Sequence, residues 1–130
     1  MKPRPPGKRR AMRAVRPHLK GWLSLDGEFL VGPRYIKLLE GIERTGTIRE
    51  GCVATRMSYR TCLTRLRQME RVLGAPIVLT RRGGADRGHA ELTDVARRLI
   101  AIYRQWRGEV EVSSQSLFRD LLRTGRGKKS

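Results

Sequence analysis

Two helices that follow each other closely, each with its own start signal, constrain the fold of this chain most strongly. Thr47 begins the first helix and Glu50 stands three residues later, a spacing typical of a capping box. Ser58 is positioned to begin the second helix and Gly74 to end it. Only a few residues around Arg56 are left between them for a turn. The sequence therefore predicts a helix-turn-helix unit.

The second of these helices has one apolar face and one face rich in arginine and threonine. Its apolar residues recur at helical spacing; they are Tyr59, Cys62, Leu63, Leu66, Met69 and Leu73. The residues of the other face are Arg60, Thr61, Thr64, Arg65 and Gln68. A solvated surface is the ordinary explanation of a polar helix face, but arginine there can also bind guanine edges in a major groove. We expect a nucleic-acid contact, because a capped helix and a basic loop flank this face.

A β-hairpin and a further helix are predicted ahead of the pair. The dipeptide Asp26-Gly27 stands between two short apolar runs, 22–25 and 28–31, and is a strong hairpin signal. A helix then begins at Pro33, since proline suits the first helical turn, and apolar residues recur after it at helical spacing. The hairpin is expected to pack on the helices that come after it in the chain, because an isolated hairpin is only marginally stable.

A second hairpin and a long helix are predicted after the pair. Residues 77–80 and 90–92 are expected to be strands around a loop rich in glycine and arginine, which makes a wing. Thr93 begins the next helix, whose apolar residues step by four and three, close to the heptad spacing of paired helices. That strip is Val95, Leu99, Ile102, Trp106 and Val110, with Ile100 and Tyr103 beside it.

Positive charge is concentrated at the two ends of the chain. The formal net charge is +17, and residues 1–20 hold eight basic and no acidic residues. Pro3, Pro5 and Pro6 disfavour a helix there, so we expect a disordered basic arm, matched by a basic tail over 124–130. Basic arms commonly lie along a nucleic-acid backbone. Solubilising tails without a fixed partner are the alternative.

Several other classes are disfavoured. The longest apolar stretches, such as 75–79, are too short to span a bilayer, and no signal-peptide segment comes after the basic N-terminus. Cys52 and Cys62 are too few for a zinc site or a disulfide framework. We expect them to face each other as free, reduced core residues, with a redox or metal switch as the alternative. No metal, cofactor or enzymatic activity is expected, since phosphate-binding loops, nucleophile elbows and His/Cys/carboxylate clusters are missing from the sequence.

The predicted fold class is mainly α with a small β component: a winged helix-turn-helix with a long C-terminal dimerisation helix. We expect a basic arm over 1–20 and a DNA-binding winged helix-turn-helix over 21–92. A long dimerisation helix and a short amphipathic helix then occupy 93–123, ahead of the tail over 124–130.

Several short segments carry a resemblance to a known family. They are Leu38 to Ile48, Met57-Ser58-Tyr59-Arg60, Gly83-Gly84, Leu92-Thr93, Leu99-Ile100 and Tyr103. Together they resemble the DNA-binding domain of the molybdate-responsive regulator ModE, which is itself similar to the winged helix-turn-helix of LysR-type regulators. The resemblance covers about residues 22–110. It implies that the helix from Ser58 lies in a major groove, that the wing contacts adjacent phosphate or minor groove, and that the helix from Thr93 pairs two subunits.

The sequence also departs from that family. Arg56 stands where members usually have glycine, so a turn that needs a positive φ is strained by about 1 kcal/mol unless it is reshaped. Gly51 replaces a usual alanine, at a cost of roughly 1 kcal/mol within a helix. ModE proteins that sense molybdate carry a further β-barrel domain. The residues after the long helix leave no room for one, so molybdate sensing is not expected.

These observations predict a sequence-specific transcriptional regulator that binds double-stranded DNA as a homodimer, in the cytoplasm and associated with the nucleoid. Control then comes from its own level or from a separate sensor or partner protein chain. The alternatives are an architectural protein that coats chromosomal DNA without specificity, or a winged helix that binds RNA or another protein. The expected DNA contacts are Thr47, Arg49, Arg56, Ser58, Tyr59, Arg60, Thr61, Thr64, Arg65, Arg81, Arg82, Arg87 and His89. The expected dimer contacts are Val95, Leu99, Ile102, Tyr103, Trp106 and Val110.

Overall fold

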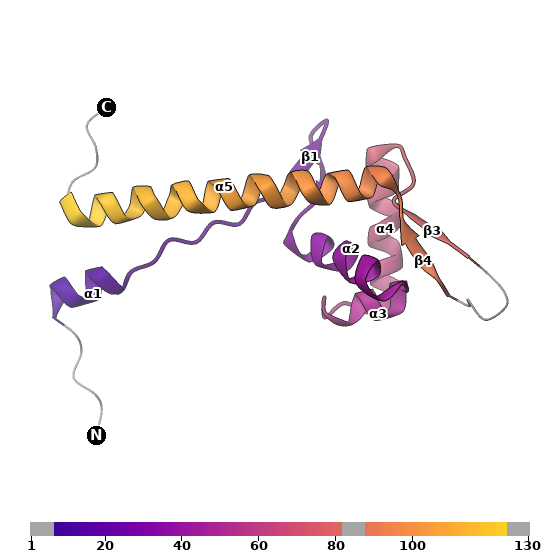
Figure 1. Cartoon of the computed structure of the whole chain (residues 1–130), viewed down its shortest axis with the longest axis horizontal. Helices are drawn as coiled ribbons and strands as arrows, with labels where there is room; N and C mark the ends of the chain where they lie inside the picture. Colours follow the sequence, from indigo (N-terminus) through magenta and orange to yellow (C-terminus); the bar gives the residue numbers. More distant parts are fainter. Residues whose placement is uncertain (1–6, 82–87, 125–130) are drawn as a thin grey trace, which may run out of the picture. The chain divides into compact units, whose positions relative to one another are not determined.

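A computed structural model describes residues 7–81 and 88–124 of the chain. The chain forms two compact units: a larger unit over 20–105, and a smaller unit made of 1–19 and 106–130. The elements in order are α1 (Lys8–Ala14), β1 (Leu23–Leu25), β2 (Glu28–Val31), α2 (Pro33–Thr45), α3 (Ile48–Val53), α4 (Tyr59–Leu73), β3 (Val78–Thr80), β4 (Ala90–Leu92) and α5 (Asp94–Thr124) (Figure 1). The described chain is mainly helical with two small sheets, which is compatible with the predicted fold class.

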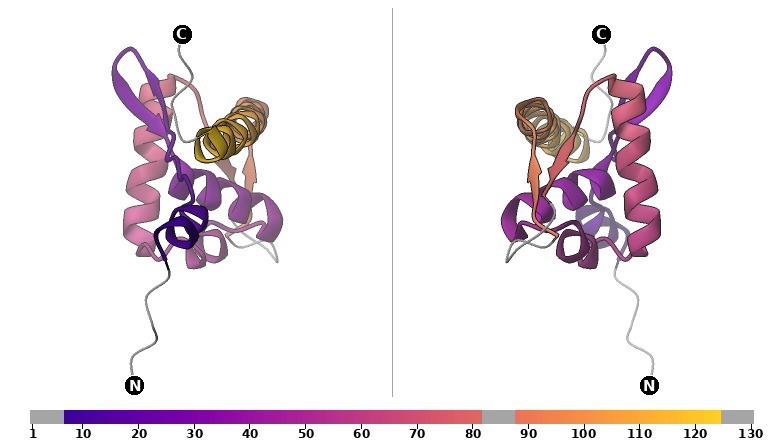
Figure 2. Two further views of the ribbon diagram at one scale, coloured as in Figure 1. Left: turned by 90° about the vertical axis from the view of Figure 1, so that its left-hand side faces the viewer. Right: turned by 90° about the vertical axis from the view of Figure 1, so that its right-hand side faces the viewer.

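The first hairpin is confirmed. β1 and β2 pair antiparallel, with Leu25 opposite Glu28 across the turn. Asp26 and Gly27 have φ values of 50° and 80°. Two consecutive positive φ values are what a tight two-residue hairpin turn requires, which is why the Asp-Gly dipeptide signalled it. Both views of Figure 2 show this hairpin alongside α4, against which β2 packs.

The core of the larger unit lies beneath α2. Its amphipathic sequence buries one face completely, at Ile36, Leu38, Leu39 and Ile42. α4, β4 and the segment before β3 complete the core with fully or nearly fully buried side chains at Cys62, Leu66, Met69, Ile77 and Leu92. Burying side chains of this size contributes roughly 1.5–3 kcal/mol each, so this cluster is the main source of stability for the unit.

α2 and α3 cross at a pair of glycines. A β-carbon built on Gly51 would lie 2.6 Å from the backbone nitrogen of Ile42, and one on Gly41 would lie 2.8 Å from the Cα of Gly51. No side chain fits at such distances. The propensity cost expected for Gly51 stays a prediction, and the structure adds that its missing side chain is what lets the two helices approach.

Cys52 of α3 and Cys62 of α4 face each other, as predicted, but they are joined by a disulfide. The prediction that they are free, reduced core residues is therefore wrong in this structure. Both are buried, at 4% and 0% exposure. The bond links α3 and α4 directly, in addition to their packing.

Helix α5 is tied to α2 within the larger unit by ion pairs and a buried tyrosine. Arg97 donates to Glu43 and Arg104 to Glu40, and these hydrogen bonds raise the pKa of each arginine above its ordinary value. Tyr103 is 2% exposed, and its hydroxyl donates to the carbonyl of Gly21 at 2.9 Å. Tyr103 is thus part of the folded core.

The smaller unit differs from the predicted arm and short final helix. Residues 8–14 form α1, because the prolines at positions 3, 5 and 6 all precede it. One continuous helix of 31 residues, α5, runs to Thr124 in place of two helices. Within this unit, Arg107 donates to the carbonyl of Leu19 and Gln115 to that of Pro17. In the described part of the chain, none of the helices has both the length and the apolar character that crossing a membrane demands.

Candidate nucleic-acid interface

The two helices of the predicted helix-turn-helix begin at the residues that the sequence indicated. Thr47 Oγ1 accepts a hydrogen bond from the N–H of Glu50 at 3.0 Å, and Ser58 Oγ accepts one from the N–H of Thr61 at 3.1 Å. Each cap satisfies a backbone donor that the first helical turn leaves open. The N–H of Thr47 pairs with Thr45 Oγ1 instead of with Glu50, so the capping box is half formed.

The turn between α3 and α4 is held from inside by Thr55. This side chain is 3% exposed; its hydroxyl donates to the carbonyl of Cys52 at 2.6 Å and accepts from the N–H of Met57 at 3.2 Å. Next to it, Arg56 has a φ of 62°, in the left-handed region. Of the two alternatives, a strained positive φ or a reshaped turn, the structure has the first. Sequence analysis missed Thr55, although a threonine just after a short helix is a known turn former.

The polar face of α4 is exposed at three of its five residues, and Thr61 and Arg65 are half-buried. Arg60, Thr64 and Gln68 are exposed, and Arg65 is half-buried with its guanidinium donating to Gln68 Oε1 at 2.9 Å. The hydroxyl of Ser58 donates to Thr61 Oγ1 at 2.9 Å. The hydroxyl of Thr64 donates to the carbonyl of Arg60, so the hydroxyls of Ser58, Thr61 and Thr64 all have partners within the helix start. The side chain of Arg60 extends into solvent.

Arg49 and Tyr59 meet at the outer edge of the two helices. The guanidinium of Arg49 lies 4.2 Å from the centroid of the Tyr59 ring. A cation over an aromatic face is worth about 0.5–1 kcal/mol at an exposed site. Both residues are expected DNA contacts. The pairing fixes the guanidinium of Arg49 near the start of α4, a relation that sequence spacing could not reveal.

The second hairpin is confirmed and is attached to the start of α3. β3 and β4 pair antiparallel, with Thr80 opposite Ala90. His89 forms an isolated bridge with Thr47, and the N–H of Ala90 donates to the carbonyl of Gly46 at 2.6 Å. In Figure 1 the hairpin extends away from the helices. The expected contacts Arg82 and Arg87 lie outside the described residues.

A hollow of about 680 Å³ lies between α3, α4 and this second hairpin. It brings together Thr47, Arg49, Tyr59 and Arg81, four of the expected DNA contacts, and adds Arg67, which sequence analysis had not included. Glu50 and Glu70 line it too. Glu70 has a structural task, since its carboxylate accepts from the N–H of Ile77 at 2.8 Å. Among residues 7–81 and 88–124, side chains suited to binding a metal ion do not gather in groups of three.

The expected dimer strip on α5 is partly exposed. Ile102 is 50% exposed, Val95 38% and Trp106 37%, while Leu99 and Val110 are half-buried. Tyr103 differs, because its ring lies in the core. The exposed apolar residues of the strip therefore lie on one side of the helix, as their spacing in the sequence predicts.

Comparison of the amino-acid sequence with known proteins finds bacterial relatives, among them proteins named as regulators. No protein-family model matches the chain. The chain is 36% identical to the molybdenum transport protein ModE of Azotobacter vinelandii over 69 residues, which is 53% of this chain and 26% of that protein. It is 31% identical over 81 residues to the DNA-binding transcriptional dual regulator ModE of Escherichia coli K12, covering 62% of this chain and 31% of that protein.

A third relative is the molybdenum-pterin-binding protein MopB of Rhodobacter capsulatus, 34% identical over 73 residues. The chain spans roughly a quarter to a third of the length of these curated relatives. Their names are those of regulators and molybdenum-related proteins. Over about half of its length, the chain is therefore supported as a relative of the ModE family.

Proposed function

We propose that the larger unit is a winged helix-turn-helix that binds double-stranded DNA, and that the chain acts as a transcriptional regulator. The observation that carries the proposal is the exposed arginine and threonine face of α4, which begins at the cap of Ser58. On one side of α4 stands a hairpin whose described end carries Arg81. A helix of this kind fits a major groove while the hairpin reaches the neighbouring backbone. The likeness to regulators named ModE supports the same function.

In this proposal, base reading and backbone contact are divided between residues. The guanidinium of Arg60 is exposed on α4 and has the geometry to donate two hydrogen bonds to one guanine. Arg49 and Arg81, around the hollow beside α4, neutralise phosphates. Each neutralised phosphate releases a counterion, so binding by a chain of net charge +17 weakens steeply as salt rises.

The experiment is a binding assay with a site chosen from random-sequence DNA. The variant Arg60→Ala with Arg65→Ala is compared with Arg98→Ala, which removes an exposed arginine from α5. We expect the double variant to weaken binding to the selected site by about tenfold or more, because each guanine contact contributes about 1–3 kcal/mol of discrimination. Arg98→Ala is expected to change both specific and non-specific binding little. An equal loss on selected and unrelated DNA would contradict base reading by α4.

A second candidate function is non-specific coating of DNA, favoured by the net charge of +17. Backbone neutralisation alone supports such binding without any base contact. The same selection separates the two functions. A sharp recurring motif supports a regulator, and recovery of unrelated sequences supports an architectural protein.

We also propose that α5 pairs two copies of the chain through the strip at Val95, Leu99, Ile102, Trp106 and Val110. Exposed Ile102 and Trp106 support this proposal, because apolar residues at near-heptad spacing gain stability by packing against a second helix. Ile102→Asp should produce a monomer in sedimentation measurements. Val112→Asp is the matched control, since Val112 is 70% exposed on another side of the helix. A wild-type monomer at all concentrations would contradict dimerisation.

A further inference from the structure

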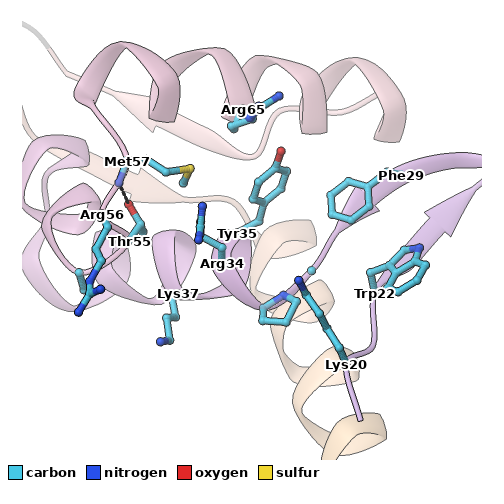
Figure 3. A pocket seen from close by; sticks show the side chains of 13 residues that line it. Lys20, Trp22, Phe29, Arg34, Tyr35, Lys37, Thr55, Arg56, Met57 and Arg65 are labelled. Carbon is cyan, nitrogen blue, oxygen red and sulfur yellow. Dashed lines mark hydrogen bonds between the residues drawn. The ribbon is translucent and has the colours of Figure 1, made fainter. Parts of the chain in front are cut away.

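A basic and aromatic trough opens beside α4, on the side of the β1–β2 hairpin. Its volume is about 790 Å³, which lies in the range of small-molecule sites. The hairpin contributes Trp22 and Phe29, and the first turns of α2 contribute Arg34 and Lys37. Figure 3 shows the two rings at one end and Arg56, from the turn before α4, at the other. The described residues that line the trough include five cations and no carboxylate.

The two rings of the trough are exposed, and the Phe29 ring is also packed against a neighbouring ring. Trp22 is 56% exposed and Phe29 47%. A β-carbon on Gly32 would lie 3.2 Å from the Phe29 ring and 3.4 Å from the Cβ of Trp22, so the lack of a side chain at Gly32 leaves room for both residues. The Phe29 ring also meets Tyr35 edge to face, with centroids 5.2 Å apart. Exposed aromatic rings that line one hollow are a ready surface for stacking.

The chemistry of the trough selects its ligand. Arginine and lysine bind phosphate, while exposed aromatic rings bind a planar ring by stacking. A DNA duplex offers phosphate on its surface, but its base faces are covered by neighbouring bases. An unpaired nucleotide offers both groups at once. We propose that this trough binds an unpaired nucleotide, with the base stacked on Trp22 next to Phe29 and the phosphate toward Arg34 and Lys37.

Such a nucleotide has two sources: a free mononucleotide, or an unpaired stretch of single-stranded DNA. In both cases the ligand lies against Arg56 and Met57, which belong to the turn that positions α4. The site stands on its own geometry and does not require the proposed duplex binding. It adds a second nucleic-acid chemistry to the same unit.

The experiment is calorimetric titration of the full chain with four probes at equal ionic strength. They are adenosine monophosphate, ribose 5-phosphate as its counterpart without a base, a six-residue oligothymidylate, and a blunt duplex. We expect adenosine monophosphate to bind at least about fivefold more tightly than ribose 5-phosphate, because stacking on one ring is worth about 1–3 kcal/mol. Binding of the oligothymidylate that is tighter than that of adenosine monophosphate and is weakened by Trp22→Ala supports single-stranded DNA as the source. Binding of the mononucleotide supports a free nucleotide.

Variants connect the binding to the trough. Trp22→Ala should weaken nucleotide binding about fivefold to a hundredfold, while Trp22→Phe keeps a stacking ring and most of the affinity. Arg34→Gln should weaken adenosine monophosphate and ribose 5-phosphate alike, since it removes a phosphate contact. Arg98→Gln, outside the trough, is the matched loss of charge and should change neither. Thermal unfolding of each variant checks that it is folded.

Two results would overturn the proposal. Equal affinity for adenosine monophosphate and ribose 5-phosphate would mean that charge alone binds them. Unchanged nucleotide affinity in folded Trp22→Ala would place the ligand elsewhere. Duplex binding is measured separately with the blunt duplex, so its loss would reject the proposed DNA function and leave the nucleotide result intact.

Discussion

Gly51 in α3 and Arg56 in the turn after it are both unusual choices for their positions, yet they have opposite effects on the fold. A helix interior usually favours alanine over glycine, and a left-handed turn residue favours glycine over arginine. Gly51 is required, because the backbone of α2 occupies the space of any side chain. Arg56 is tolerated although its φ of 62° is strained, because its side chain is exposed. The local preference for alanine therefore fails at Gly51, where packing leaves no space for a side chain. The local preference for glycine still applies at Arg56, which solvent surrounds.

The largest expected effect comes from Gly51→Ala. The new methyl group would lie 2.6 Å from the nitrogen of Ile42, so α2 and α3 must separate. We expect a loss of about 3 kcal/mol in the free energy of unfolding, at the upper end of what overpacking costs. Urea denaturation followed by circular dichroism measures it. Greater stability than wild type would mean that helix propensity decides at Gly51, and it would contradict the contrast drawn with Arg56.

Removing the disulfide should have the next largest effect. The bond closes a loop of about ten residues that contains Arg56, and the chain-entropy relation gives about 2.5 kcal/mol for such a loop. Cys52→Ala with Cys62→Ala should lower the denaturation midpoint, and reducing the wild type should do nearly the same. Mass measurement after thiol labelling checks that the bond forms. Two labelled thiols in protein purified without reductant would contradict it.

Arg56→Gly should have the smallest effect and the opposite sign. Relief of the left-handed conformation gains about 1–2 kcal/mol, and the greater freedom of glycine in the unfolded chain returns about 0.5–1 kcal/mol. We expect the variant to be more stable by roughly 0.5–1 kcal/mol, again by urea denaturation. Arg56→Ala, which keeps the strain, is the control and should not gain. A gain shared by both variants would point to charge and not to backbone strain.

The sequence predicted what depends on neighbours along the chain. The Asp26-Gly27 turn, the caps at Thr47 and Ser58, and the helix end at Gly74 each need only local chemistry, and each is confirmed. The positive φ of Arg56 was expected from the family resemblance. The polar face of α4 was predicted from helical spacing alone, and its exposure matches.

Features that depend on distant residues were beyond sequence reasoning. The contact between Gly41 and Gly51 exists only because two helices cross there, and no periodicity encodes it. The trough joins Trp22 of the hairpin region to Arg56 of a turn more than thirty residues later. α1 was missed for a different reason: the prolines all precede residue 8, so they do not disfavour a helix over 8–14.

The hydroxyl of Tyr103, bonded to the carbonyl of Gly21, fixes the rotational phase of α5 about its own axis. Successive residues of an α-helix are about 100° apart around the axis. Because the Tyr103 side chain points into the core, neighbouring side chains such as that of Ile102 point toward solvent. A single residue inserted between Arg97 and Tyr103 would oblige the helix to choose between keeping that bond and keeping the ion pair of Arg97 with Glu43. Within the larger unit, that hydroxyl and the ion pairs of Arg97 and Arg104 together decide which residues of α5 face solvent.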